Sequence, residues 1–503
     1  MKTSRTLIVA FIIAFGLLQR VYKIDLPLVD FYPTRQIQTA NITKNLIEDK
    51  FNFLYPRVDY YGPQHKYYLI EFPGYNLVVA YLSTILGSFG DWQGRIVSIA
   101  SYAFATLFLF LLISKLLGKT IATYSVAFFT FSPLSVLTSR AFQPDEMMLF
   151  SAIASLYFLH KWLLANKFIY LLVAAVLFSW AVLLKITAAV FLFPVFYYIF
   201  FQKDRKIVNF KFFFFLILSF VPAFLWYRHS YIFSVKIDSF FASDYRLVNW
   251  FDPSLYVSYP YYSNIFGFEL NLVLLPIGLL LLTLGLLLKP KKNFGFIYSW
   301  LSGVILYFVV FNRHVMSHEY YHLPFLPIAS IFMAIASESI INMVVSSRTA
   351  VIRNRIFATT LFFFIYLIST LPITMQRAYR PIERFSFVKD AAGSLEKLTK
   401  PDDLIVGSMD GGPALVYYSN RKGWSFNVDR EKIKEHFEFI KIEDTQVSSA
   451  IEELEDRRRL GAKVFASGNK SQFISNKFFS EYMYSNYKVL EDNDKFIIFD
   501  LSK

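Results

Sequence analysis

Residues 87–146 read GSFGDWQGRIVSIASYAFATLFLFLLISKLLGKTIATYSVAFFTFSPLSVLTSRAFQPDE. Two apolar blocks within this stretch, 95–116 and 120–138, are separated by a short turn, with Lys115 at the end of the first block and Lys119 in the turn. A helix needs roughly 20 predominantly apolar residues to cross a bilayer. The stretch therefore predicts two membrane-spanning helices, with a polar run at the membrane boundary where the second helix ends.

The composition of the whole chain indicates a membrane protein. Of its 503 residues, 55% are hydrophobic and only 17% are charged, which soluble domains rarely match. The formal net charge of +14 does not indicate a nucleic-acid partner, because Lys and Arg lie mainly between the apolar blocks, where they set topology and contact anionic lipid. The absence of cysteine excludes disulfides, thiolate catalysis and Cys-ligated metals.

Apolar blocks of this kind recur along most of the chain and predict a polytopic α-helical protein with about 11 transmembrane helices. The predicted spans are 6–18, 95–116, 120–138, 147–164, 168–184, 187–201, 210–227, 271–288, 294–311, 323–345 and 356–375. Two further helices, at 35–50 and 74–89, are predicted to lie flat at the membrane surface.

The orientation follows from the basic loops, since Lys and Arg accumulate on the cytoplasmic side. Five loops are basic, and they contain Lys115/Lys119, Lys161/Lys167, Lys203/Arg205/Lys206, Lys289/Lys291/Lys292 and Arg348/Arg353/Arg355. All five fall inside if the N-terminus is inside and 74–89 lies on the outer surface, whereas all five fall outside if 74–89 spans. The first arrangement is predicted.

This topology divides the chain into a transmembrane domain, 1–375, and a soluble extracytoplasmic domain, 376–503. The first outer loop of the transmembrane domain covers residues 22–95. In the C-terminal domain, strand-like runs at 404–408, 414–418, 462–466 and 495–500 alternate with polar helical stretches. A small α/β domain is expected there.

Polar groups at the outer membrane boundary are the candidates for function, because burying them near lipid is costly. They come from the first loop, the loop before residue 147, the junction near residue 185 and the loop at 312–322. The candidates are Asp30, Arg35, Gln36, Glu71, Arg140, Asp145, Glu146, Lys185, His318, Glu319, Tyr320 and Tyr321.

Each candidate also has a structural explanation. Asp145 follows Pro144 and precedes a helix, so it could be an N-cap, and Lys185 could extend to the lipid headgroups. The aromatic residues of the 312–322 loop could form an interfacial belt. His318 and His322 are four residues apart, a spacing that permits metal ligation on one helix face, so a divalent cation is left open although no metal site is assigned.

Taken together, these carboxylates and cations fit a sugar carried on a polyprenyl phosphate. Such a donor has its lipid tail in the bilayer, its phosphate at the boundary and its sugar outside. Cations would hold the phosphate and stabilise it as it leaves. A carboxylate would remove the proton of the acceptor hydroxyl as it attacks the anomeric carbon.

Several motifs resemble those of the GT-C superfamily of glycosyltransferases, in particular bacterial enzymes similar to protein O-mannosyltransferases and aminoarabinose transferases. YPTRQIQTANITKN (32–45) resembles the helix of the family's first loop, and EFP (71–73) resembles the entry to its second surface helix. Residues 87–146 follow the family's order of motifs, and HEYYHLP (318–324) resembles its later outer loop. The resemblance covers roughly the first 330 residues.

The resemblance implies roles for the candidate residues. Asp30 and Asp145 would be the catalytic carboxylates. Arg35, Arg140 and Lys185 would face the donor phosphate. The pocket would be formed by Gln36, Glu71, Glu146, His318, Glu319, Tyr320 and Tyr321. Many relatives have Asp-Glu just before the arginine, but Tyr32 and Pro33 stand there in this chain, so the base remains open between Asp30 and Asp145.

The expected function is transfer of a monosaccharide from a polyprenyl-phosphate donor to an extracytoplasmic protein, lipid or glycan, with inversion implied by the resemblance. The expected location is the bacterial inner membrane, with membrane lipid as a partner. The alternatives are a transporter or flippase of lipid-linked sugar, which would need midplane charges or an inverted repeat, a non-catalytic envelope assembly protein, and an enzyme that transfers a whole glycan.

Overall fold

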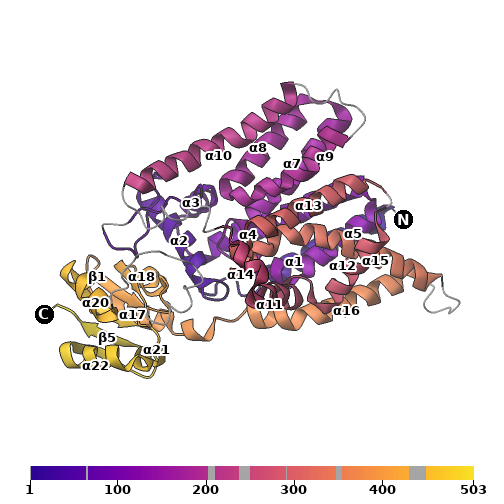
Figure 1. The fold of residues 1–503 in the computed structure, drawn as a ribbon. Helices are drawn as coiled ribbons and strands as arrows, with labels where there is room; N and C mark the ends of the chain where they lie inside the picture. The colour runs from indigo at the N-terminus through magenta and orange to yellow at the C-terminus, as the bar shows by residue number, and fades with distance from the viewer. Residues whose placement is uncertain are drawn as a thin grey trace.

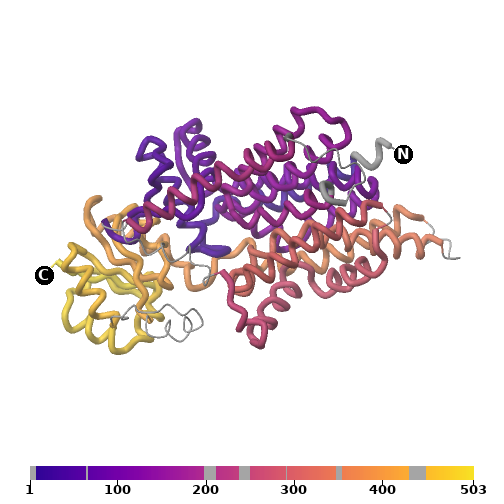
Figure 2. Tube along the Cα trace, turned by 45° about the horizontal axis from the view of Figure 1, so that its top comes forward, coloured from indigo at the N-terminus to yellow at the C-terminus, as the bar shows by residue number. Residues whose placement is uncertain are grey.

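A computed structural model describes residues 2–63, 66–201, 210–236, 250–290, 292–346, 354–429 and 449–502. The chain forms a long body of helices with a small sheet domain at one end, beside the first outer loop (Figures 1 and 2). Some of the basic residues used to predict the orientation lie outside the described residues, namely Lys203, Arg205, Lys206, Lys291, Arg348 and Arg353.

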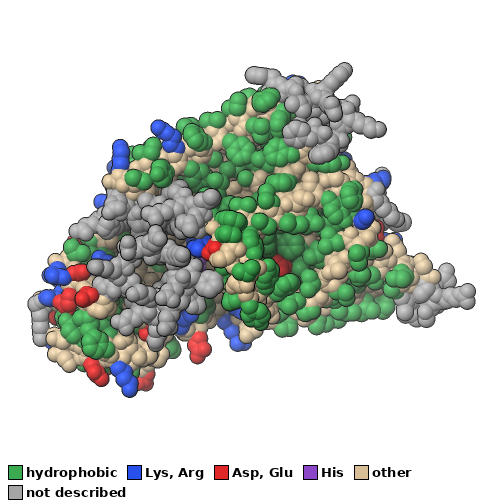
Figure 3. Space-filling view, in the orientation of Figure 1, with side chains coloured by type: hydrophobic (Ala, Val, Ile, Leu, Met, Phe, Trp, Pro, Cys, Tyr) green, Lys and Arg blue, Asp and Glu red, His purple; other side chains and the backbone are tan. Residues whose placement is uncertain are grey.

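The body is built from α1 (Lys2–Val21), α4 (Asp91–Leu116), α5 (Lys119–Phe131), α6 (Pro133–Arg140), α7 (Asp145–Ala165), α8 (Phe168–Leu184), η1 (Ile186–Leu192), α9 (Phe193–Phe201), α10 (Phe210–Lys236), α12 (Leu275–Leu288), α13 (Phe294–Val310), α15 (Leu326–Val345) and α16 (Arg355–Ala378). Hydrophobic side chains cover this body in Figure 3, whereas charged side chains of both signs gather at the end formed by the sheet domain. This distribution is the one expected of a protein whose body faces lipid.

Within the described residues, five helical segments are long and apolar enough to cross a membrane, and two bent pairs satisfy the same criterion when each pair is taken together. The five are Asp91–Leu116, Asp145–Ala165, Lys211–Lys236, Glu319–Val345 and Arg355–Phe385. Shorter apolar helices occupy the remaining predicted spans, at Leu7–Val21, Phe168–Leu184, Ile186–Tyr197 and Phe294–Val310. The polytopic helical fold is therefore confirmed, and the number of spans stays a prediction.

The bent pairs differ from the straight spans that the sequence suggested. Lys119–Phe131 meets Pro133–Arg140 at 63°, because Ser132 is extended and Pro133 cannot donate a backbone hydrogen bond. Tyr259–Val273 meets Leu275–Leu288 at 100°. The first bend matters for the site, because it turns the short helix α6 towards the first outer loop.

Shorter helices form the loops on the side of the sheet domain. They are α2 (Pro33–Glu48), α3 (Gly74–Leu86), η5 (Pro253–Val257), α11 (Tyr259–Phe268), the π-helical turn η6 (Glu269–Val273), α14 (Asn312–Ser317), η7 (Glu319–Phe325) and η8 (Glu383–Phe385). The helices α2 and α3 lie where surface helices were predicted. Most of α2 is buried, including polar side chains such as Gln36 and Asn45, so this helix is packed within the protein rather than lying on a lipid surface.

The C-terminal domain has a five-stranded mixed sheet in the order β2-β1-β3-β5-β4. The strands are β1 (Leu404–Ser408), β2 (Lys422–Phe426), β3 (Ala462–Ser467), β4 (Lys488–Asp492) and β5 (Ile497–Asp500). The sheet packs with α17 (Val388–Leu398), α18 (Ala414–Tyr418), α20 (Ala450–Arg459), α21 (Lys470–Ser475) and α22 (Lys477–Asn486). The strands β2, β1 and β3 pair in parallel, whereas β5 is antiparallel to β3 and β4.

The prediction of a strand at 414–418 was wrong, because these residues form the helix α18. Pro413 stands at the start of this helix, and parallel strands such as β1 and β2 need a crossover connection, which α18 supplies. The other three predicted strands correspond to β1, β3 and β5.

The first outer loop pairs with the free edge of this sheet. The amide of Gly62 donates to the carbonyl of Gly423 (2.7 Å), and the amide of Ser425 donates to that of Tyr60 (2.9 Å). A third bond runs from the amide of Gly423 to the carbonyl of Asp59 (2.9 Å). The edge strand β2 is thereby covered, and the C-terminal domain is joined to the loop that carries several of the candidate residues.

We expect Gly62→Ala to weaken this junction more than a matched glycine substitution does. Gly62 has a φ of 78°, and a Cβ there would lie 2.2 Å from Nε1 of Trp424. Gly87 has a similar φ of 69° but nothing within 4 Å of its Cβ position. Both alanines share a backbone cost of about 1–2 kcal/mol, so thermal unfolding in detergent should show a larger loss for Gly62→Ala. Equal losses would contradict a role for the Trp424 contact.

Candidate active site

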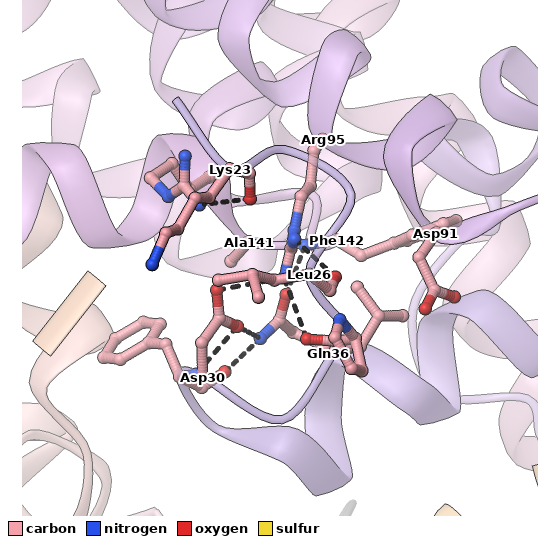
Figure 4. Close-up of polar contacts among 12 residues, drawn as sticks. Lys23, Leu26, Asp30, Gln36, Asp91, Arg95, Ala141 and Phe142 are labelled. Atoms are coloured by element: carbon pink, nitrogen blue, oxygen red, sulfur yellow. Dashed lines mark hydrogen bonds and ion pairs between the residues drawn. The ribbon is translucent and has the colours of Figure 1, made fainter. Parts of the chain in front are cut away.

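Asp30 is held in a buried network at the start of the first outer loop (Figure 4). Its Oδ2 accepts from the guanidinium of Arg95 at 2.9 Å, and both side chains are almost fully buried. Its Oδ1 accepts from the amide of Phe31 at 3.0 Å and from Nε2 of Gln36 at 3.1 Å. Both oxygens of this predicted catalytic carboxylate are therefore already engaged.

Arg95 also organises the backbone that leads to Asp30. Its guanidinium donates to the carbonyls of Ile24 (2.9 Å), Leu26 (2.6 Å) and Pro27 (3.2 Å). From the sequence, Arg95 was expected only as the first residue of a predicted span, and this role was not predicted. A single arginine at the outer end of a long apolar helix was the feature that could have revealed it, since a charge placed there is costly unless it is paired.

Arg140, which was predicted to face the donor phosphate, binds backbone instead. It donates to the carbonyls of Arg20, Tyr22 (2.6 Å) and Lys23 (3.1 Å), and it lies 4.7 Å from the ring centre of Tyr379. Arg95 and Arg140 together bind six carbonyls between Arg20 and Pro27, at the end of α1 and in the chain that follows it. The structure therefore places Arg140 beside the first loop rather than among the other predicted phosphate ligands.

Asp145 and Lys185 form a buried ion pair. Oδ1 of Asp145 accepts from Nζ of Lys185 at 2.7 Å, and the two side chains are 3% and 5% exposed. Oδ2 of Asp145 is buried and has no hydrogen-bond partner in the described part of the chain. Lys185 also lies 4.8 Å from the ring centre of Tyr320 and 5.0 Å from that of Tyr321.

This pair decides between the two readings of each residue. Asp145 is the first residue of α7 and Pro144 is the N-cap position, so the carboxylate is not the cap. Lys185 stands in extended backbone between α8 and η1, with its ammonium buried against Asp145 rather than among headgroups. Asp145 is therefore not an N-cap, and Lys185 does not extend to the lipid headgroups, so both structural explanations are wrong.

Arg35 and Glu71 form a second ion pair next to the first. Their side chains are 19% and 25% exposed, and Arg35 also donates to Oε1 of Gln38 at 2.7 Å. A pocket between α2 and α3 is lined by Arg35, Thr39, Ile42, Pro56, Tyr68, Glu71, Phe72, Pro73, Asn76 and Pro144. Since Pro144 immediately precedes Asp145, this pocket lies beside the Asp145–Lys185 pair.

The 312–322 loop covers the site with aromatic rings. The hydroxyl of Tyr32 donates to the carboxylate of Glu319 and links this loop to the first one. The rings of His318 and Tyr320 are stacked at 5.3 Å, and Tyr32 meets both rings edge-on. Burial lowers the pKa of His318 to about 4, with the nearby charges of Lys185 and Arg35 acting in the same direction, so this imidazole is neutral at pH 7.

The two remaining predicted pocket residues, Gln36 and Glu146, bind neighbouring segments of the protein rather than facing the pocket. Oε1 of Gln36 accepts from the amide of Phe142 at 2.9 Å, so Gln36 connects Asp30 with the segment that leads to Asp145. Glu146 is turned away, since its Oε1 accepts from the hydroxyl of Thr138 on α6 at 2.6 Å.

His322 does not share a metal site with His318. Its Nδ1 lies 2.7 Å from Oε1 of Glu269 and its Nε2 lies 3.0 Å from the carbonyl of Val315, so both ring nitrogens are engaged. Among the described residues, no group of three or more His, Cys, Asp or Glu side chains is placed to hold a metal ion. The histidine spacing noted in the sequence is thus explained by packing of the loop.

Comparison with known proteins supports a glycosyltransferase. Residues 72–227 match the family described as dolichyl-phosphate-mannose-protein mannosyltransferase. No curated protein sequence gives a significant match. The family match favours an enzyme over the transporter and scaffold alternatives. It runs from the start of α3 into α10 and includes the segment that presents Asp145.

Solved structures show the same fold over nearly the whole chain. ArnT from Cupriavidus metallidurans bound to undecaprenyl phosphate is 12% identical, with a TM-score of 0.66 and 98% of each chain covered. The oligosaccharyltransferase AglB from Archaeoglobus fulgidus, in complex with an inhibitory peptide and a dolichol phosphate, is 13% identical, with a TM-score of 0.61, and 97% of this chain and 74% of that chain are covered. The arabinofuranosyltransferase AftD from Mycobacteria is 11% identical, with a TM-score of 0.56, over 98% of this chain and 41% of that chain.

We expect Arg95→Met to destabilise the fold more than Asp30→Asn. The methionine removes the donors for one carboxylate and three carbonyls and leaves Asp30 as an unpaired buried charge, which costs about 3–5 kcal/mol. The asparagine keeps the shape and leaves Arg95 its carbonyl acceptors. Thermal unfolding in detergent measures both variants, and an equal or smaller loss for Arg95→Met would contradict the organising role of the guanidinium.

The lowered pKa of His318 predicts a stability effect in mild acid. Because the folded protein holds the imidazole neutral down to about pH 4, whereas an unfolded histidine titrates near 6.5, the folded state loses stability as the pH falls from about 6.5 towards 4. The variant His318→Phe should lose about 1–2 kcal/mol less between pH 7 and pH 5. Parallel stability curves for the variant and the original protein over this pH range would show that His318 titrates normally.

Proposed function

We propose that this chain, which has the fold of the GT-C glycosyltransferases, is itself a glycosyltransferase that transfers a monosaccharide from a polyprenyl-phosphate donor to an acceptor on the extracytoplasmic side of the membrane. One observation carries this proposal. Asp145 has one oxygen held by Lys185 and the other buried without a partner, and the pocket lined by Arg35 and Glu71 lies beside it.

Lys185 and Arg35 are the proposed ligands of the donor phosphate. They come from distant parts of the chain, the end of α8 and the first turns of α2, and each is paired with a carboxylate. These pairs keep the cations compensated in a region of low exposure. A phosphate that enters the pocket would exchange with Asp145 on Lys185 and with Glu71 on Arg35, and both cations would stabilise the charge on the phosphate as it leaves. Arg140 is not included, since backbone carbonyls occupy its guanidinium.

Asp145 is the proposed general base. Its Oδ2 is unpartnered, and release of Lys185 to the phosphate would free the second oxygen as well. The carboxylate would take the proton of the acceptor nucleophile as that nucleophile attacks the anomeric carbon and the polyprenyl phosphate departs, which inverts the configuration. Asp30 is less suited to this task, because Arg95, Gln36 and the Phe31 amide hold both of its oxygens.

The aromatic loop is proposed to close over the sugar. Tyr320 and Tyr321 lie against Lys185, and neutral His318 stacks on Tyr320. Flat rings of this kind suit the apolar face of a sugar, and a neutral imidazole adds no charge that would compete with Lys185 for the phosphate. The bond between Tyr32 and Glu319 would keep this loop in contact with α2.

The side of the membrane is proposed from the distribution of basic residues. Loops at the opposite end of the body contain Lys115, Lys119, Lys161 and Lys167, and such loops face the cytoplasm. The site and the C-terminal domain would then lie outside, with a bacterial inner membrane as the location that the motifs favour.

The test compares two neighbouring carboxylates of α7. In membranes supplied with a polyprenyl-phosphate monosaccharide and acceptor, Asp145→Asn should lower the transfer rate by about 10²–10⁴-fold, the usual contribution of a general base. Glu146→Gln is the matched control, because its side chain faces Thr138 and should leave most of the activity. Retained transfer by Asp145→Asn together with loss in Asp30→Asn would assign the base to Asp30.

A further inference from the structure

Two tyrosines of the C-terminal domain form hydrogen bonds with the outer end of α4. The hydroxyl of Tyr417 donates to Oδ1 of Asp91 at 2.9 Å, and the hydroxyl of Tyr418 donates to Oδ2 at 2.8 Å. Both tyrosines end the short helix α18, and Asp91 is the first residue of α4. One carboxylate of the membrane domain therefore receives two bonds from the soluble domain.

Tyr418 makes a further hydrogen bond, to the segment that leads to Asp30. Its hydroxyl accepts a 2.6 Å hydrogen bond from the amide of Leu28, a fully buried residue two positions before Asp30. The next residue is held as well, since the amide of Ile382 donates to the carbonyl of Val29 at 2.8 Å. The soluble domain and its linker thus fix the backbone immediately before Asp30.

These contacts close a ring around the end of α4. Asp91 and Arg95 are four residues apart, so they lie on the same face of the helix, and Figure 4 shows Arg95 bound to Asp30 and Asp91 on the other side of Gln36 and Phe142. The carboxylate of Asp91 accepts from the hydroxyl of Tyr418, and that hydroxyl accepts from the amide of Leu28. The guanidinium of Arg95 forms an ion pair with Asp30. From Asp30, the bonds through Gln36 reach the amide of Phe142, three residues before Asp145.

The domain has a second, independent attachment, because β2 pairs with residues 59–62 of the first loop through three backbone hydrogen bonds. Loss of one hydroxyl at Tyr418 would therefore leave the domain attached. The effect of that hydroxyl on the position of the loop can be separated from its effect on docking.

We propose that Tyr418 is a positioning residue for glycosyl transfer. Its hydroxyl binds both the Leu28 amide and Asp91 of α4, and so it fixes the distance between this loop and the helix. The fixed loop in turn keeps Asp30, Gln36 and the 142–145 segment in position relative to Lys185. The soluble domain is on this account a part of the catalytic arrangement, although it contributes no group that touches substrate. The proposal rests on the proposed function, because its kinetic readout is sugar transfer.

The test uses Tyr418→Phe with Tyr417→Phe as its matched control in the full-length protein. Each variant removes one hydroxyl and one bond to Asp91, but only Tyr418→Phe frees the Leu28 amide. Tyr418→Phe should lower kcat by roughly ten- to a hundredfold, as misplacement of a catalytic segment does, with the KM for the donor within about twofold. Tyr417→Phe should keep a kcat near that of the original protein.

Hydrogen exchange supplies a readout that does not depend on activity. In Tyr418→Phe, a peptide covering residues 24–31 should exchange faster, whereas a peptide covering 59–62 should stay protected. In Tyr417→Phe both should stay protected. Faster exchange at 24–31 without a fall in kcat would overturn the positioning role, and so would equal kinetic losses in the two variants.

The same experiment separates this proposal from the proposed function. If the original protein transfers no sugar from a polyprenyl-phosphate monosaccharide, the proposed function fails, and the exchange data still decide whether Tyr418 holds the loop. Unchanged exchange at 24–31 in Tyr418→Phe would overturn the proposal even in a fully active enzyme.

Discussion

The site depends on one buried guanidinium. Arg95 binds the Asp30 carboxylate and three carbonyls of the chain that leaves α1, so it fixes a loop that has little regular structure of its own. A buried charge with so many acceptors is costly to leave unpaired, and the loop is therefore held in one conformation. From this anchor, hydrogen bonds through Gln36 reach the segment that presents Asp145.

The reactive groups themselves are arranged as compensated pairs. Lys185 with Asp145 and Arg35 with Glu71 bring together α8, α7, α2 and the first loop, and each pair keeps low-exposure charges neutral overall. Such pairs can open towards an anionic ligand because a phosphate replaces the carboxylate as the partner of the cation. The arrangement thus accounts for both the stability of the site and its proposed chemistry.

The sequence predicted the fold well where long-range packing was not needed. Apolar blocks and basic loops indicated the helices, whereas α18 was mistaken for a strand because five apolar residues carry no periodicity that distinguishes the two. The convergence of Arg35, Glu71, Asp145, Lys185 and the aromatic loop was anticipated. The roles of Arg95 and Arg140 were not anticipated, because a sequence does not show which arginines donate their hydrogen bonds to backbone carbonyls. The bond between Tyr418 and Leu28 was not anticipated either, because it joins residues 390 positions apart.

The central claim is that Lys185 and Arg35 exchange their carboxylate partners for the donor phosphate beside Asp145. A structure of the protein with a bound polyprenyl phosphate tests it most directly. The account predicts phosphate oxygens at hydrogen-bond distance, about 2.7–3.2 Å, from the Lys185 ammonium and the Arg35 guanidinium, with Asp145 free of its lysine partner. A phosphate bound elsewhere, with both ion pairs intact, would contradict it.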